Sequence, residues 1–492
     1  MSLPDTGRGG AFRNSLSALP FHPKPAGVPR MPAAKTGSRG WSPDARHSAA
    51  LLLVRLGRGR RTLEALLEEL DSAGAIRDPR DRDLLNALVF GVLRWQGRLD
   101  FVLSRFSKTP LAKIDAMVLA ILRTALFQIL FLSRIPPSAA VNSAVEAAKV
   151  MAGTWVAPFV NAVLRRAAAE HSAVVFPDRK SLPVQALAAE QACPEWLVER
   201  WLERYGVEAA ADLCASINRL PQLTLRANTL KASRDDLVAS IRAAAAEAAP
   251  ADTAPDGVRV IGLKSTLADL EAFRRGWFQV QDEAAQLVTV LLDPLPGEAV
   301  LDACAGRGGK TGHIAQLMRD RGRLVALDQS AARLSQLRVE MARLGISMAS
   351  ICEADLLQPG GWLPEEFFDR ILLDAPCSGL GTMRRNPDIK WSASKEDLHR
   401  LGGIQLRLLQ RVSSRLKLAG VLVYAVCSPE PEETVQVVQA FLSSNPRFRI
   451  DRGVEALPDA VRPLIDSHGF LQTYPHMSYM DGFFAVRLKI AT

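Results

Sequence analysis

The stretch AVLDACAGRGGKTGHIAQLM, residues 299–318, decides the fold class, because it joins a short apolar run to a glycine-rich loop and a helical pattern. Four more apolar runs follow, each before a helical segment: RLVALDQ (323–329), SMASICEAD (347–355), DRILLDAP (369–376) and GVLVYAVCS (420–428). Regular alternation of strands and helices predicts a doubly wound parallel sheet, the Rossmann-like α/β architecture.

Four of these predicted strands end in an acidic residue: Asp302, Asp328, Asp355 and Asp374. Ligands of open α/β sheets bind at the carboxyl ends of the strands. We therefore expect these carboxylates to meet at one edge and to line a single site.

The glycine loop DACAGRGGKT, residues 302–311, is compatible with three ligands to different degrees. A phosphate-binding Walker loop requires glycine where this chain has Cys304, which excludes a nucleoside triphosphatase. A dinucleotide fingerprint is incomplete, because Thr311 replaces its third glycine. The third ligand is S-adenosylmethionine. Its carboxylate can bind backbone amides at a helix start, and its ribose hydroxyls can donate to Asp328, 26 residues after Asp302.

Two cysteines stand at predicted strand ends, and we expect both to face this site. Cys377 lies three residues after Asp374, and Cys427 ends the last parallel strand. Ser428 is predicted to cap a helix that begins near Pro429, and a helix N-terminus favours a thiolate. Three glutamates oppose that effect: Glu430, Glu432 and Glu433. Three other cysteines are expected to be inert core residues: Cys193, Cys214 and Cys352.

A thiolate, an acid and a methyl donor together suit methylation of carbon 5 of cytosine. This carbon is a poor nucleophile until a thiolate adds to carbon 6 and produces an enamine that attacks the methyl group. Asp374 is placed to hydrogen-bond the polar edge of the pyrimidine, and a base must then remove the proton at carbon 5. Methylation of nitrogen needs no covalent nucleophile.

The rest of the chain predicts several domains. Residues 1–170 carry 24 Lys+Arg against 13 Asp+Glu, whereas the remainder carries 37 against 39, so a polyanion partner is expected at the front of the molecule. The predicted parts are a disordered basic tail (1–42), a helical domain (43–170), a linker (171–185), a helical connector with a small α+β module (186–285) and the catalytic domain (286–492). Within the module, a helix is expected over 234–249, followed by an alanine- and proline-rich loop at 248–257.

Composition excludes several classes of protein. The longest apolar run is interrupted by Arg123 and Gln128, which predicts no membrane span. The scattered cysteines lack the spacing of a zinc site and the density of a disulfide scaffold, and no signal-peptide pattern precedes the helical domain. We therefore expect a reduced, cytoplasmic, monomeric protein without a metal.

RNA contacts are predicted after the Cys377 loop and on the helical domain. Basic and aromatic side chains cluster at Arg384, Arg385, Lys390 and Trp391, a combination suited to phosphate contact and base stacking. Arg165 and Arg166 are expected to extend this track. Because a stacked base is inaccessible, the expected substrate is a single-stranded or extruded cytosine.

Several motifs closely resemble the NOL/NOP/Sun family of RNA cytosine-5 methyltransferases: WFQVQDEAAQLV (277–288), LDACAGRGGKTGHIAQLM (301–318), LLDAPCSGLGTMRRNPDIKW (372–391) and DGFFAVRL (481–488). The helical part, with RDLLNALVFGVLRW, VNSAVEAAK and PFVNAVLRR, is similar to the NusB-type RNA-binding domain of the bacterial Sun subgroup. The resemblance spans the chain from about residue 44 and implies an all-α NusB-like domain, a ferredoxin-like α+β module and a Rossmann-like class I methyltransferase domain. It also implies 16S ribosomal RNA as the substrate.

The resemblance implies a role for individual residues. Cys427 would be the attacking nucleophile and Cys377 would assist release of the methylated RNA, with Asp374 and Lys310 beside the target base. The implied cofactor site consists of Cys304, Ala305, Gly306, Arg307, Gly308, Gly309, Lys310, Asp328, Asp355 and Asp374.

The chain departs from the family pattern at two places. Gly306 and Arg307 replace the usual Ala-Pro of the cofactor loop, and Val426 replaces the usual threonine before Cys427. Neither change removes a group that the mechanism requires. Alternatives are a non-catalytic RNA-binding factor with a degenerate methyltransferase domain, a methyltransferase acting on protein or small molecules, and a nicotinamide dehydrogenase.

Overall fold

The computed structural model describes residues 44–491, except for 60, 75, 77, 359–364 and 454–456. The predicted basic tail, residues 1–42, lies outside the described residues. None of the helices in this described part is long and apolar enough to cross a membrane.

The first part of the described chain is helical, as the three- and four-residue spacing of its apolar residues predicts. Its helices start at sequence signals: Asp44 and Asp115 accept hydrogen bonds from the first free backbone N–H groups of their helices. Asp78 does the same for the longest helix, which has a proline in its first turn, where no N–H is needed. These helices are α1 (Ala45–Gly57), α2 (Leu63–Ser72), α3 (Pro79–Phe106), α4 (Ala116–Phe131), α5 (Pro137–Met151) and α6 (Ala157–Glu170).

A helical connector follows, consisting of α7 (Pro183–Glu190) and α8 (Glu195–Ser216). Gly206 interrupts α8 with a φ of +77°, a left-handed conformation that glycine adopts without a steric penalty. Trp201, on α8, is the centre of a small core in which the connector packs against Leu380 and Met383 of the catalytic domain.

The small module is a four-stranded antiparallel sheet in the order β2-β3-β1-β4. Its elements are β1 (Leu223–Ala227), α9 (Arg234–Arg242), β2 (Ala245–Pro250), β3 (Gly257–Leu263), α10 (Glu271–Arg274) and β4 (Phe278–Val280). The prediction of a helix over 234–249 was wrong in its second half, because the alanine-rich segment pairs with β3 and buries Ala245 and Ala248. Pairing with a strand formed later in the chain overrides the helix propensity of alanine.

The large sheet has the order β10-β12-β9-β8-β5-β6-β7, with β11 paired to β12. Its strands are β5 (Ala299–Asp302), β6 (Arg323–Asp328), β7 (Ala349–Glu353), β8 (Phe368–Asp374), β9 (Leu416–Val426), β10 (Phe448–Ile450), β11 (Phe470–Thr473) and β12 (Phe483–Ile490). The five strands β5 to β9 are parallel, as predicted, but β12 runs antiparallel to β9. The sheet is therefore mixed rather than wholly parallel.

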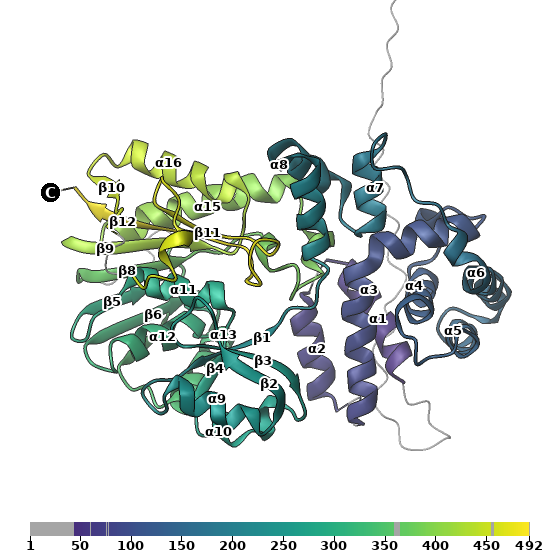
Figure 1. The fold of residues 1–492 in the computed structure, drawn as a ribbon, viewed down its shortest axis with the longest axis horizontal. Coiled ribbons are helices and arrows are strands. Elements are labelled where there is room, and N and C mark those ends of the chain that lie inside the picture. The colour runs from purple at the N-terminus through teal and green to yellow at the C-terminus, as the bar shows by residue number, and fades with distance from the viewer. Residues whose placement is uncertain are drawn as a thin grey trace, which may run out of the picture. The chain divides into compact units, whose positions relative to one another are not determined.

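Helices cover both faces of this sheet (Figure 1). One face packs on α11 (Glu283–Leu292), α12 (Gly309–Leu317) and α13 (Ala331–Leu344), and the other on α15 (Lys395–Ser413) and α16 (Val435–Ser444). A single-turn helix, α14 (Ile389–Ser392), precedes α15. The two layers make two hydrophobic cores, and the carboxyl ends of the parallel strands remain free for a site.

Candidate active site

The parallel strands bring the predicted acidic residues to one edge of the sheet. Asp302, Asp328 and Asp374 are the last residues of β5, β6 and β8, and Asp355 follows β7 by two positions. Since β5 lies between β8 and β6, these carboxylates come from neighbouring strands. Cys427 directly follows β9, which is paired with β8, so the last strand ends beside the same group.

Two cysteine sulfurs meet at this edge. The Sγ atoms of Cys377 and Cys427 are 3.3 Å apart, within hydrogen-bond distance for sulfur, and both residues are partly buried. The hydrogen bond with Cys427 and burial raise the pKa of the Cys377 thiol, and the nearby carboxylates of Glu433 and Asp374 act in the same direction. Cys377 is therefore protonated at neutral pH and able to donate a hydrogen bond to its neighbour.

A partly buried ion pair lies beside the sulfurs. The Nζ atom of Lys310 lies 2.6 Å from Oδ2 of Asp374 and 5.2 Å from the ring centre of Phe483. Burial opposes the charged ammonium, but the Asp374 carboxylate outweighs it and raises the pKa of Lys310. The pair thus places a charged donor, Lys310, and a carboxylate acceptor, Asp374, at the carboxyl edge of the sheet.

The glycine loop has the features required to hold S-adenosylmethionine. Gly306 donates its N–H to Oδ2 of Asp328 at 2.9 Å, which joins the loop to the end of β6. A side chain at Gly306 would meet open space, whereas a Cβ at Gly308 would lie 2.9 Å from Leu337. The loop leads into α12, whose first N–H groups have no partner within the helix and can donate hydrogen bonds to the carboxylate of the cofactor.

Asp302 lies beneath this loop and is only 1% exposed. Its Oδ2 accepts a hydrogen bond of 2.7 Å from Thr311, while Oδ1 has no hydrogen-bond partner among the described residues. Burial raises the pKa of Asp302 to about 7, although the Thr311 bond opposes this shift. Contact of Asp328, Asp355 and Asp374 with the positively charged cofactor stays a prediction.

The unusual residue of the loop, Arg307, reaches out of the catalytic domain. Its guanidinium pairs with Glu64 and, at 3.0 Å, with Glu68, both on α2 of the helical domain. Because Arg307 is at least 239 positions from these glutamates in the chain, the contact could not be recognised from the sequence. Arg307, which departs from the family pattern, therefore connects the cofactor loop to the helical domain.

The segment after Cys427 differs from the prediction. No α-helix begins near Pro429; instead, a short 3₁₀ turn spans Pro431–Glu433 and α16 starts at Val435. Proline at 431 and the buried side chains of the turn hold this tighter geometry. Ser428 Oγ accepts from the N–H of Glu430 at 3.3 Å, so it stabilises a turn and not a helix start.

Two of the three glutamates of this segment, Glu430 and Glu432, have distant partners that sequence reasoning missed. Oε2 of Glu430 accepts hydrogen bonds from Arg200 at 2.8 Å and from Arg204 at 3.0 Å, both on α8. Glu432 accepts a further bond of 2.7 Å from Arg200. No local signal pairs these residues, because more than 220 positions separate them.

The structure does not support RNA contact for three of the predicted residues. Arg384 and Lys390 are 2% and 1% exposed. Arg384 pairs with Asp481, and Lys390 donates to the carbonyl of Arg94 at 2.9 Å. Trp391 donates to the carbonyl of Leu93 at 2.7 Å. The side chains of Lys390 and Trp391 thus connect the catalytic domain to α3, as does the bond from Arg94 to the carbonyl of Arg384. Burial lowers the pKa of Lys390 to about 8.

The other residues predicted to contact RNA are at least partly exposed to solvent. Arg385 is partly exposed, although Asp282 and Asp481 each accept a hydrogen bond of 2.6 Å from it. Arg165 and Arg166 are exposed on α6, and their contact with RNA stays a prediction.

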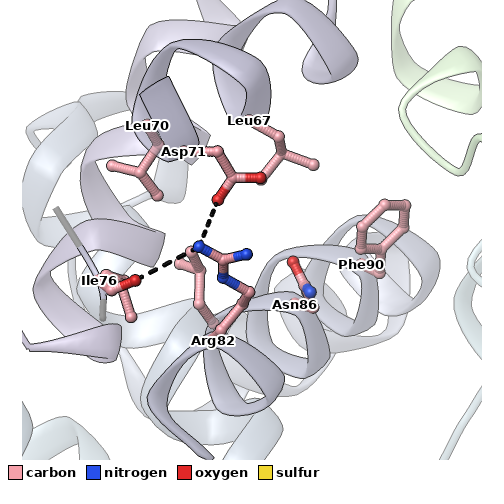
Figure 2. Close-up of a pocket in the computed structure, with 8 residues that line it drawn as sticks. Leu67, Leu70, Asp71, Ile76, Arg82, Asn86 and Phe90 are labelled. Carbon is pink, nitrogen blue, oxygen red and sulfur yellow. Dashed lines mark hydrogen bonds and ion pairs between the residues drawn. The ribbon is translucent and has the colours of Figure 1, made fainter. Parts of the chain in front are cut away.

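A separate cavity of about 300 Å³ lies between α2 and α3. Figure 2 shows Arg82, one of its lining residues, bonded to Asp71 and to the carbonyl of Ile76. Leucine, isoleucine and phenylalanine side chains make up most of its wall, and it contains neither a cysteine nor any of the strand-end acids. It is therefore distinct from the site at the sheet edge.

Comparison with known families divides the chain into three recognised domains. Residues 43–169 match the NusB family, residues 193–264 match the ferredoxin-like domain of RsmF/B-like methyltransferases, and residues 289–489 match the family described as 16S rRNA methyltransferase RsmB/F. The fold is thus an all-α NusB domain, a ferredoxin-like module and a methyltransferase domain. The cofactor of such a methyltransferase is S-adenosylmethionine, which the site described above fits.

Curated relatives and solved structures extend along most of the chain. A protein of Bacillus subtilis named probable ribosomal RNA small subunit methyltransferase B is 37% identical, covering 89% of this chain and 96% of the relative. The ribosomal RNA small subunit methyltransferase B of Pseudomonas putida is 36% identical, covering 91% and 98%. The crystal structure of PH0851 is 25% identical with a TM-score of 0.75, covering 90% of this chain and 98% of that one. A methyltransferase homolog from Pyrococcus horikoshii is 28% identical with a TM-score of 0.54, covering 63% and 99%. Because this similarity extends over nearly the full length of the chain, the chain belongs to the 16S rRNA methyltransferase RsmB/F family.

Proposed function

We propose that this protein transfers the methyl group of S-adenosylmethionine to carbon 5 of a cytosine in 16S ribosomal RNA, with Cys427 as the covalent nucleophile. The observation that carries the proposal is the approach of two sulfurs to 3.3 Å beside the Lys310–Asp374 pair. The names of the relatives support a small-subunit ribosomal RNA substrate. The specificity for carbon 5 rests on the sulfur chemistry.

The reaction begins when the Cys427 thiolate adds to carbon 6 of an extruded cytosine, forming a carbon–sulfur bond. The electron pair of the C5–C6 double bond shifts into the ring, where protonated nitrogen 3 receives it. Asp374 is the acceptor for the polar edge of the base, and Lys310 donates a hydrogen bond of 2.6 Å to its carboxylate. Carbon 5 becomes nucleophilic as a result.

The bound cofactor supplies an electrophilic methyl group, which carbon 5 accepts. Carbon 5 then loses its proton to a base, the C5–C6 double bond forms again and the bond to Cys427 breaks. The leaving sulfur carries the electron pair and negative charge. Cys377, kept protonated by its surroundings, donates a hydrogen bond to this sulfur and stabilises it as it leaves.

The test is to incubate the Cys377→Ala variant with cofactor and 16S ribosomal RNA and to measure RNA that stays attached to denatured protein. We expect this variant to accumulate the adduct and the Cys377→Ala/Cys427→Ala double variant to form none. Cys352→Ala, at a cysteine on β7 outside the sulfur pair, is the matched control and should turn over normally. An adduct in the double variant would refute the role of Cys427.

Methyl transfer to the RNA is measured in the same reactions by mass spectrometry of nucleosides. 5-Methylcytidine is the expected product of the unmodified protein. A methyl group on nitrogen or ribose would contradict the proposed chemistry. The domain limits and the monomeric state stay predictions.

A further inference from the structure

A buried hydrogen-bonded cluster lies next to the two cysteines and centres on Glu433. This residue ends the 3₁₀ turn Pro431–Glu433, six positions after Cys427, and is 0% exposed. Burial raises the pKa of its carboxyl, while hydrogen bonds, chiefly from Ser378, oppose the shift. The methyl-transfer mechanism described above does not use it.

The Glu433 carboxylate binds the residue that follows Cys377. Its Oε1 accepts from the backbone N–H of Ser378 at 2.7 Å, and its Oε2 accepts from the Ser378 hydroxyl at 2.5 Å. The residue on the other side of Cys377 is held as well, because Gln405 donates to the carbonyl of Pro376 at 3.0 Å. Gln405 also donates to Glu433 at 3.1 Å, so both neighbours of Cys377 are connected to this one carboxylate.

The Cys427 segment also contacts Glu433, through the Ser428 hydroxyl, but backbone bonds give this segment further support. β9 leads directly to Cys427, and its last residue, Val426, is paired with Phe484 of β12. The carbonyl of Cys427 accepts from the N–H of Gly381 at 3.0 Å. Beyond it, Arg200 and Arg204 hold Glu430 from α8, as described above. Removing the Glu433 carboxylate therefore loosens the Cys377 loop first.

We propose that Glu433 is a positioning residue that holds the Cys377 loop so that its thiol faces the Cys427 sulfur during release of the product. The inference rests on the proposed function, because it assigns a support to Cys377. It predicts that loss of Glu433 produces the defect of a missing Cys377, and not the defect of a missing nucleophile.

The experiment measures the denaturation-resistant adduct and the rates of single and multiple turnover for Glu433→Ala, with Cys377→Ala in parallel. We expect adduct to accumulate in Glu433→Ala, and multiple turnover to fall about tenfold, equivalent to about 1.4 kcal/mol in the barrier to release. Single-turnover methylation should change much less. Glu433→Gln, which keeps one acceptor oxygen for the N–H of Ser378, should restore most of the turnover.

The matched control is Glu432→Ala, since this neighbouring glutamate pairs with Arg200 and makes no contact with the Cys377 loop in the described structure. It should accumulate no adduct. Ser378→Ala removes the 2.5 Å bond to Glu433, together with the longer contacts of the hydroxyl with Ser428 and Leu380, but keeps the bond from the Ser378 N–H to Glu433. It gives a second, milder test that does not depend on how well Glu433→Ala folds. We expect it to raise the adduct level above that of the unmodified protein.

Two outcomes would overturn the inference. The first is normal turnover without adduct in Glu433→Ala or Ser378→Ala. The second is a folded Glu433→Ala that forms neither adduct nor product, because Glu433 would then serve the nucleophile. Absence of adduct in Cys377→Ala itself would refute the proposed covalent mechanism, and the role inferred for Glu433 would then also be refuted.

Discussion

Replacing the buried acid Asp302 by asparagine should change how the stability of the protein depends on pH. In the folded protein, burial raises the pKa of Asp302 to about 7, whereas the value for an exposed aspartate is 3.8. A group with a raised folded pKa keeps its proton in the folded state after the unfolded chain has lost it. Between pH 3.8 and about 7 the folded state therefore binds more protons, and stability falls as pH rises.

The magnitude follows from the separation of the two pKa values. Each unit of pH in this window lowers the free energy of unfolding by about 1.4 kcal/mol, so the whole window lowers it by about 4 kcal/mol. Asparagine has a similar shape, accepts the Thr311 bond and does not titrate. Between pH 6 and pH 8, the free energy of unfolding of Asp302→Asn should therefore rise by about 1.4 kcal/mol relative to that of the unmodified protein.

The assay is urea unfolding followed by circular dichroism at pH 6 and pH 8, at constant ionic strength. Asp369→Asn is the control, because Lys417 and the N–H of Ala299 bond this acid and its pKa is lowered despite burial. Stability contributed by Asp369 is lost only at acidic pH, so its variant should differ from the unmodified protein by the same amount at pH 6 and pH 8. An equal difference for Asp302→Asn at both pH values would refute the reasoning.

Three further substitutions test other parts of the site. Lys310→Met leaves the Asp374 carboxylate without its partner, so the rate of methyl transfer should fall by about a hundredfold, a loss of about 2.7 kcal/mol in transition-state stabilisation. The circular dichroism spectrum should stay unchanged. A rate within threefold of that of the unmodified protein would contradict this role of Lys310. Asp328→Ala removes the acceptor for the loop and for the ribose, so calorimetry should show at least tenfold weaker binding of S-adenosylmethionine, about 1.4 kcal/mol; equal affinity would exclude Asp328 from the cofactor site. Arg200→Ala leaves the buried Glu430 carboxylate with fewer hydrogen-bond donors and should lower the free energy of unfolding in urea by about 3 kcal/mol. A change below about 0.5 kcal/mol would show that the Arg200–Glu430 pair contributes no more to stability than a solvent-exposed salt bridge.

Local pattern predicted the parts of the fold that repeat along the chain. Apolar runs that end in acids identified the parallel strands, because strands buried on both faces need continuous hydrophobic sequence. The same rule predicted the meeting of Asp302, Asp328 and Asp374, since parallel strands share one carboxyl edge. Local pattern failed at 245–250, where pairing with β3 outweighs helix propensity.

The cysteine pair was predicted from the position of each residue after its strand. Its 3.3 Å separation required the pairing of β8 with β9, which no local signal specifies. The basic and aromatic cluster after Cys377 was interpreted as an RNA surface because its composition suits one. Lys390 is buried and Trp391 is partly buried instead, since both bond to α3, nearly three hundred positions earlier in the chain.

The amino-acid sequence alone was enough to predict the five parallel strands, the acids at their carboxyl edge and the two cysteines at strand ends, because each of these depends on residues close together in the chain. The pairing of charges could be read only from the folded chain. Arg307 contacts α2, Glu430 contacts α8 and Glu433 contacts the Cys377 loop through side chains far apart in sequence. Such contacts depend on how the domains pack, and packing is a property of the whole folded chain.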